Sequence, residues 1–274
     1  MDGFLETTAM VDLIFKDKTA RNRVQSVLSS YQTTYTSQYV RMEIKRGVLQ
    51  YYVALYNKSI ECKNLTEVIE YIQTISYTPQ RNRLGALFGA LTMSYERIAR
   101  RSVGVGAPAN QITTIQKKLF EGILRAKIKQ FWASFAKQVN VVLDPAECYK
   151  HKYTLKPPVM TPEGRFDNAL ENCDKYKSGI CRVRQLLNGN QAGVAAIIKT
   201  LNALPDPDAE TQKRRRALKE VMRLKNRDVP RRECWHSGDA VIALESPAGA
   251  EIVTHNCKHF TPLCQALGKP LRCY

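Results

Sequence analysis

Both ends of the chain alternate short apolar or β-branched runs with helical patterns, and this alternation constrains the fold most. Residues 3–6 (GFLE) and 33–37 (TTYTS) predict strands, and each is followed by apolar positions at helical spacing. Residues 251–255 (EIVTH) and 270–274 (PLRCY) predict two more strands, with one helical pattern before them and one between them. Such alternation is typical of a parallel sheet covered by helices. We therefore expect an α/β fold in which a small parallel sheet, built from both chain ends, is flanked by helices.

The middle of the chain, residues 61–231, predicts a large inserted α-helical region. Its apolar residues recur at helical spacing, and the proline-rich residues 144–165 predict an extended connection between helices. We expect residues 1–274 to form a single discontinuous domain, whose core consists of residues 1–60 and 232–274.

The chain carries a strong positive charge. Its 274 residues include 42 lysines and arginines against 25 aspartates and glutamates, which leaves a formal charge of +17. A charge of this size attracts polyanions such as nucleic acid or an anionic membrane surface. No apolar stretch approaches the roughly 18 residues that span a bilayer, and the first residues lack the layout of a signal peptide. We therefore expect a cytoplasmic protein that binds nucleic acid and no membrane.

The eight cysteines, in a chain without an export signal, favour reduced thiols or metal ligands over a framework of disulfides. Cys148, His151, Cys173 and Cys181 offer four ligands that suit zinc, although their spacing differs from that of a standard zinc finger. Two interpretations stay open, namely a structural Zn²⁺ ion that pins the proline-rich connection and ordinary buried thiols.

Three acidic residues lie at the edges of the predicted strands and helices. Glu6 directly follows the first strand, Glu43 lies early in the second helix, and Asp239 begins the helix before residues 251–255. Sites in parallel sheets form where strands end and the next helices begin, so these carboxylates can converge. A converged set is costly unless a hard divalent cation neutralises it. The alternative is that each acid caps a helix and complements its dipole.

The sequence around these acids resembles that of the PIN-domain family. The matching segments, in chain order, are FLETTAMVDLIF, YTSQYVRMEIKRGVL and SGDAVIALESPAGAEIVTHNCKHF. In that family one acid ends the first strand, a second lies on the helix after a short strand, and a third begins a helix before an apolar run. Glu6, Glu43 and Asp239 match these positions. The family's last strand ends in a Thr-x-Asn or Thr-x-Asp turn, which Thr254 and Asn256 match.

The resemblance implies a metal-dependent endonuclease that hydrolyses phosphodiester bonds, usually in RNA. Glu6, Glu43 and Asp239 would hold Mg²⁺ or Mn²⁺, and Asn256 would ligate metal or position the attacking water, so that all four are candidate catalytic residues. Position 6 is Glu where the family usually has Asp, and the carboxylate therefore reaches one methylene further. The separation of Glu43 and Asp239 is also longer than is usual in the family, which the helical insertion would explain.

Basic residues near the proposed site are candidates for phosphate contacts, which weaken with salt. The set comprises Arg41, Lys45 and Arg46 beside Glu43, and the run Lys213, Arg214, Arg215 and Arg216. His255 and His259 flank the last turn, and for both we expect a structural role.

Two other functions stay open at this stage. The chain has Glu6 where the family usually has Asp, and Asn256 in place of a fourth acid. These two departures would also suit a non-catalytic nucleic-acid-binding protein that keeps the fold. Alternatively, the helical insertion would serve as an interaction module for a protein partner such as an inhibitory antitoxin.

Overall fold

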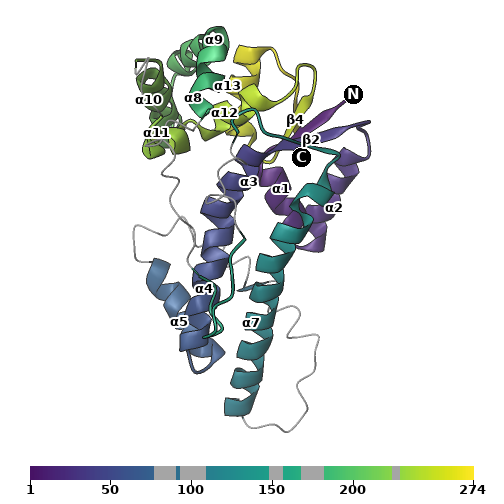
Figure 1. The fold of residues 1–274 in the computed structure, drawn as a ribbon, viewed down its shortest axis with the longest axis vertical. Coiled ribbons are helices and arrows are strands. Elements are labelled where there is room, and N and C mark those ends of the chain that lie inside the picture. Colours follow the sequence, from purple (N-terminus) through teal and green to yellow (C-terminus); the bar gives the residue numbers. More distant parts are fainter. Residues whose placement is uncertain (77–90, 93–108, 148–156, 168–181, 224–228) are drawn as a thin grey trace.

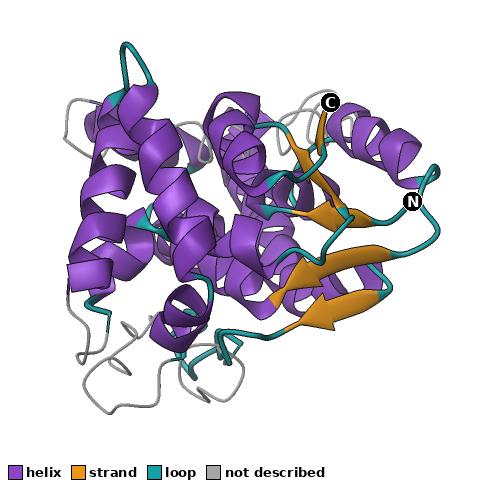
Figure 2. Ribbon diagram, turned by 90° about the horizontal axis from the view of Figure 1, so that it is seen from above, coloured by secondary structure: helices purple, strands orange, loops and turns teal. Residues whose placement is uncertain are grey.

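The computed structural model describes residues 1–76, 91–92, 109–147, 157–167, 182–223 and 229–274, and its centre is a five-stranded, all-parallel sheet (Figure 1). The strands are β1 (Gly3–Leu5), β2 (Thr34–Ser37), β3 (Val141–Leu143), β4 (Glu251–Thr254) and β5 (Leu271–Cys273). Helices surround this sheet (Figure 2), so the predicted α/β class with a small parallel sheet flanked by helices is confirmed.

The strand order β3-β2-β1-β4-β5 places β1 in the middle of the sheet. From β1 the chain moves outward through β2 to β3, and it then returns to the other side of β1 to form β4 and β5. The direction of winding therefore reverses between β1 and β4. In open parallel sheets, ligands bind at such a switch point, at the carboxyl ends of the strands.

The sheet differs from the sequence prediction in one strand. The four expected strands are present, but β3 comes from residues 141–143, inside the region predicted to be a helical insertion with no strand in the sheet. Asn140 explains part of its placement, because its Oδ1 accepts hydrogen bonds from both the backbone N and the Oγ1 of Thr34, each at 2.8 Å. The prediction that the sheet consists of the chain ends alone is therefore wrong.

The helices of the described residues fall into two stretches of the chain. The first stretch contains α1 (Thr7–Ile14), α2 (Lys18–Leu28), α3 (Gln38–Ile44), the π-helical turn η1 (Lys45–Leu49), α4 (Gln50–Glu61) and α5 (Leu65–Ser76). The second contains α7 (Ala109–Ser134), the 3-10 turn η3 (Phe135–Gln138), α8 (Val183–Gly189), α9 (Gln191–Ala203), α10 (Ala209–Arg223), α11 (Arg231–His236), α12 (Gly238–Glu245) and α13 (Cys257–Leu267). In Figure 1, α4 and α7 extend side by side away from the sheet.

Helices from the middle of the chain pack directly on the elements of the chain ends. Phe131 of α7 stacks on Phe15 at the end of α1, with ring centroids 5.6 Å apart, and the ring of Tyr52, within the predicted core, also lies 5.0 Å from that of Phe15. On α9, a Cβ added at Gly193 would come within 3.0 Å of Leu267 at the end of α13. The absence of a side chain thus lets α9 lie close against α13. These contacts join the two parts into one core.

The cysteines only partly follow the expectation of reduced thiols. Cys62, Cys234 and Cys264 are buried thiols that belong to no disulfide, whereas Cys257 and Cys273 form a disulfide between the start of α13 and β5. β5 pairs with β4 in the sheet, and β4 directly precedes α13 in the chain. The end of β5 therefore lies beside the start of α13, where the two sulfurs meet. The four proposed zinc ligands, Cys148, His151, Cys173 and Cys181, lie outside the described residues.

Within the described residues, no helix is both long and apolar enough to cross a membrane.

Candidate functional site

Glu6 lies at the carboxyl end of β1, where it caps α1. Its carboxylate accepts hydrogen bonds from the backbone N atoms of Thr8 at 2.8 Å and Ala9 at 3.3 Å, and it also bonds the hydroxyl of Thr8. The side chain is almost fully buried. Burial raises the pKa of Glu6 to about 7, and the charge of Asp239 adds to the rise, whereas the bonds from Thr8 oppose it.

Glu43 projects from α3 toward the same edge of the sheet. The N-terminus of α3 is fixed because Ser37, the last residue of β2, accepts a hydrogen bond from the backbone N of Val40 through its Oγ at 3.2 Å. The Oγ1 of Thr7 donates to Glu43 Oε2 at 2.6 Å. Burial raises the pKa of Glu43 to about 8, and the negative charges of Asp239 and Glu6 raise it further. Asp239 therefore acts electrostatically on both predicted glutamates, and Glu6 acts on Glu43.

Asp239 lies in the first turn of α12, and two cationic groups face it. Arg214 of α10 forms an ion pair with Asp239 through Nη2, and Nδ1 of His259 lies 3.5 Å from the same carboxylate oxygen. Burial alone would raise the pKa of Asp239, but the hydrogen bond with His259 and the charge of Arg214 lower it below its usual value. The pKa of Asp239 is thus shifted in the opposite direction from those of its neighbours Glu6 and Glu43.

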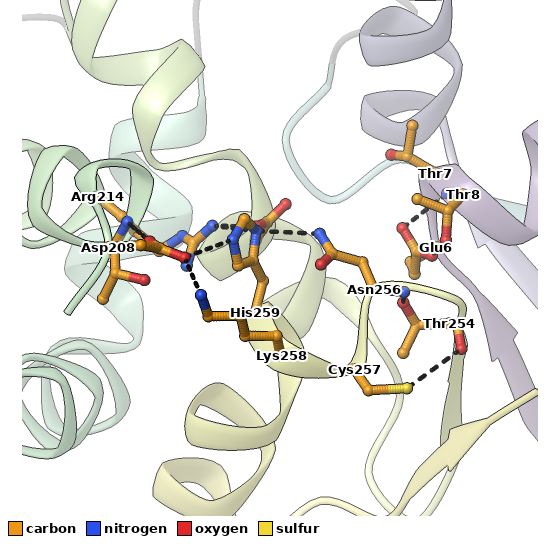
Figure 3. A network of polar contacts seen from close by, with 12 residues as sticks. Glu6, Thr7, Thr8, Asp208, Arg214, Thr254, Asn256, Cys257, Lys258 and His259 are labelled. Carbon is orange, nitrogen blue, oxygen red and sulfur yellow. Dashed lines mark hydrogen bonds and ion pairs between the residues drawn. The ribbon is translucent and has the colours of Figure 1, made fainter. Parts of the chain in front are cut away.

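His259 and Asn256 continue the polar network along the first turn of α13 (Figure 3). Nδ2 of Asn256 lies 3.0 Å from Nδ1 of His259, and Nε2 of His259 lies 3.4 Å from Asp208, at the N-terminus of α10. The hydrogen bond with Asp239 raises the pKa of His259 above its usual value. Figure 3 shows Asn256 between His259 and the group formed by Glu6 and Thr8. The last strand therefore delivers its turn residues to the same edge as β1.

A pocket of about 300 Å³ opens at this edge of the sheet. Carboxylates, cations and one aromatic side chain line it, together with part of the π-helical turn η1. The lining residues are Thr7, Glu43, Ile44, Gly47, Val48, Glu210, Arg214, Trp235, His236, Asp239, Asn256 and His259. Single π-helical turns inside helices are frequent at functional sites. The pocket lies where the topology of the sheet predicts a ligand site.

The side chains at this edge have the right ligand atoms for a hard divalent cation, but they are not arranged around a common point. Glu6, Glu43, Asp239 and Asn256 offer oxygen atoms, which Mg²⁺ and Mn²⁺ prefer. Among the described residues, however, no group of three or more His, Cys, Asp or Glu side chains is arranged to hold a metal ion. Glu6 is engaged as a helix cap and Asp239 is paired with Arg214. Metal binding would require these carboxylates to exchange their present partners for the ion.

The basic residues beside Glu43 pack inward more than the sequence suggested. The guanidinium of Arg41 lies over the ring of Trp132, 4.2 Å from its centroid, and Lys45 is buried with its Nζ 5.8 Å from the same ring. Arg46 lies near enough to Glu43 to lower its pKa slightly against the stronger effect of burial. Arg41 and Lys45 thus stabilise the contact between α3 and α7.

The basic run on α10 has two kinds of member. Lys213 and Arg216 are exposed, and Lys213 pairs with Glu210 at 2.7 Å, whereas Arg215 is half-buried. Arg214 points in the opposite direction and is only 4% exposed, because it reaches Asp239 in the pocket. Arg214 was predicted as one of several surface contacts to phosphate, and the structure places it in the wall of the pocket.

No family model matches this chain, and neither do any curated protein or solved structure. The PIN resemblance therefore stays a prediction from the sequence motifs.

Two residues of the site were not among the predicted ones. His259, expected to be structural, contacts Asp239 and Asp208, and its position three residues after Asn256 would place both on one face of a helix. His255, the other histidine, is 62% exposed and lies 3.6 Å from Asp12, away from the pocket lining. Trp235 also lines the pocket, and no pattern in the sequence around it indicates this position.

Proposed function

We propose that this protein is a metal-dependent endonuclease of the PIN type, with RNA as its substrate. One observation carries the proposal: Glu6, Glu43 and Asp239, from three separate segments of the chain, lie close enough at the switch point of the sheet that the charge of Asp239 helps to raise the pKa of both Glu6 and Glu43, and the charge of Glu6 helps to raise that of Glu43. Buried carboxylates with like charges are costly, and a divalent cation is the partner that removes this cost. The order of these residues along the chain is the order of the matching acids in PIN domains.

The residues that would hold Mg²⁺ or Mn²⁺ are Glu6, Glu43 and Asp239, with Asn256 beside them. When bound, such an ion activates water and stabilises the negative charge that develops during phosphodiester hydrolysis. Asn256, in the turn after β4, would orient a water molecule through its side-chain amide. No nucleophilic side chain is needed for this chemistry.

Two cationic side chains would bind the phosphate of the substrate. Arg214 and His259 both contact Asp239, and the raised pKa of His259 favours its charged form near neutral pH. Their positive charges attract a phosphodiester into a pocket that carboxylates would otherwise make repulsive to anions. The formal charge of +17 would steer a long polyanion toward the protein from a distance. We infer RNA in the cytoplasm as the substrate from the PIN resemblance.

Cleavage of labelled RNA with Mn²⁺, Mg²⁺ or EDTA tests the proposal. The wild type is expected to cut only with metal, and Asp239→Asn is expected to reduce the rate at least about 100-fold, because a metal ligand is lost. Glu70→Gln provides a matched control, since Glu70 is an exposed acid on α5 outside the pocket. Metal-dependent cleavage that survives in Asp239→Asn would exclude this site.

A second candidate function is non-catalytic binding of nucleic acid, and the ion pair between Arg214 and Asp239 favours it. In a protein without metal, a guanidinium in this place neutralises Asp239 permanently. This candidate predicts salt-sensitive RNA binding by the wild type and by Asp239→Asn, with no cleavage in either.

A further inference from the structure

Trp235 has an exposed ring at a polar pocket. It lies in the last turn of α11, lines the pocket, and is 46% exposed. The other tryptophan of the chain, Trp132, is covered by the guanidinium of Arg41 at 4.2 Å. No such cation or aromatic ring lies over Trp235 within the described part of the chain. A large apolar surface is therefore presented to solvent beside carboxylates and cations.

Arg214 supplies a second, independent indication of a ligand in the same pocket. Its Nη2 bonds Asp239, but its Nε and Nη1 are buried and have no hydrogen-bond partner among the described residues. Buried donors without a partner carry a cost in free energy, which an acceptor from a ligand would remove. A guanidinium is well suited to the oxygens of a phosphate, to which it can donate two hydrogen bonds at once.

The pocket thus combines a phosphate-binding group with an aromatic platform, which are the two features that recognise one nucleotide of a single strand. We propose that Trp235 stacks on an unpaired base of RNA whose neighbouring phosphate is held by Arg214, so that the pocket selects single-stranded over double-stranded RNA. This inference rests on the proposed function, and it names the form of the substrate. In a duplex the faces of each base are covered by its neighbours, so a protein aromatic ring can stack only on a base that is splayed out.

The charge of the surroundings favours RNA over a protein as the group that covers Trp235. Arg214 and His259 lie in the same pocket and offset the carboxylates of Glu43, Glu210 and Asp239 there. The exposed Arg216, and Lys213 with its partner Glu210, lie on α10, which packs against α11. These cations would follow the backbone of a single strand while its base meets the indole. Stacking on aromatic side chains combined with a positive groove is the usual way of binding single strands.

Binding in EDTA tests the inference without cleavage. The probes are a fluorescein-labelled single-stranded 12-nucleotide RNA, the same RNA in a duplex, and a single strand of the same length that lacks bases. The wild type is expected to bind the single strand most tightly. Trp235→Ala is expected to weaken binding of the single strand about tenfold or more, and to change binding of the strand without bases less than twofold. Trp235→Phe keeps an aromatic face and is expected to restore most of the affinity.

The controls separate this inference from the proposed function. Val159→Ala removes another exposed apolar side chain, outside the pocket, and is expected to bind like the wild type. Equal affinity of Trp235→Ala and wild type for the single strand would overturn the inference, and so would an equal loss on all three probes. Hydrolysis of bis-p-nitrophenyl phosphate by the wild type with Mn²⁺ is measured separately. Its absence would count against the metal-dependent enzyme, whereas the binding data alone decide the role of Trp235.

Discussion

Glu43 and Asp239 are acids of one pocket with opposite pKa shifts, and their neighbours explain the difference. Burial, together with the charges of Asp239 and Glu6, raises the pKa of Glu43 to about 8. Asp239 is also buried, but His259 and Arg214 stabilise its charged form and lower its pKa. A cation that enters the pocket would therefore gain most from Glu43, because this carboxylate has the least compensation in the protein without metal.

Glu43→Gln is expected to change how stability depends on pH. Because the pKa of Glu43 is raised from 4.5 to about 8 on folding, its contribution to stability is fully present below pH 4.5 and is lost as the pH rises to about 8. Without metal, the variant should therefore be more stable than wild type at pH 8.5, by roughly 1–3 kcal/mol, and should differ little at pH 4.5. Urea unfolding in EDTA at both pH values measures this. A variant that is less stable than wild type at pH 8.5 would contradict the proposed cause.

The packing of α12 on α3 sets the position of Glu43, and Gly238 is the point of contact. A Cβ added at Gly238 would overlap Oε1 of Glu43, so the lack of a side chain here makes room for the carboxylate. This is an arrangement between two elements far apart in the chain. Because Gly238 directly precedes Asp239, this contact also sets the position of Asp239 relative to Glu43.

Gly238→Ala is expected to displace the Glu43 carboxylate and to lower metal-dependent cleavage at least about tenfold, although it removes no carboxylate. The matched control is Gly122→Ala on α7, where an added Cβ meets nothing within 4 Å. The control should cleave like the wild type and gain up to about 1 kcal/mol in stability. Cleavage rates with Mn²⁺ and thermal unfolding of both variants measure these effects. A Gly238→Ala protein with full activity would show that the position of Glu43 does not matter.

The disulfide between Cys257 and Cys273 ties α13, which carries His259 and directly follows Asn256, to β5. It closes a loop of 16 residues, for which a crosslink is expected to contribute about 3 kcal/mol by restricting the unfolded chain. Cys273→Ser should lower the free energy of unfolding by this order under oxidising conditions. With a reductant present, wild type and variant should unfold alike. Equal stability in both conditions would mean that the disulfide has no such effect.

The sequence predicted the elements whose patterns are local. Residues 3–6 and 251–255 each combine a buried apolar run with a turn and a following helix, and both strands form as expected. β3 escaped prediction because three residues carry too little pattern and its partner, β2, lies more than 100 positions away. Trp235 escaped for a similar reason, because only tertiary packing brings α11 to the pocket. Glu6, Glu43 and Asp239 could be proposed together from the sequence because strand ends and helix starts of a parallel sheet share one edge, and because their surroundings resemble PIN domains; their role as metal ligands stays a prediction.

At the scale of the whole molecule, the positive charge should make RNA binding strongly dependent on salt. Arg216 is exposed on α10, and its replacement removes one phosphate contact if this helix binds the strand. For Arg216→Ala, the slope of log affinity against log salt should decrease in size by about 0.7. Lys63→Ala, an exposed site just before α5, is the control and should leave the slope unchanged. Fluorescence anisotropy between 50 and 300 mM salt, about the usual range, measures both. Identical slopes for the two variants would mean that the RNA strand does not bind along α10.

The most direct measurement of the central claim is calorimetric titration of Mn²⁺ into the protein without nucleic acid at pH 8. The account predicts saturable binding to the wild type and to Glu70→Gln, and loss of that binding in Glu43→Gln and in Asp239→Asn. Absence of Mn²⁺ binding by the wild type, or binding that survives in both site variants, would contradict a metal site formed by these carboxylates.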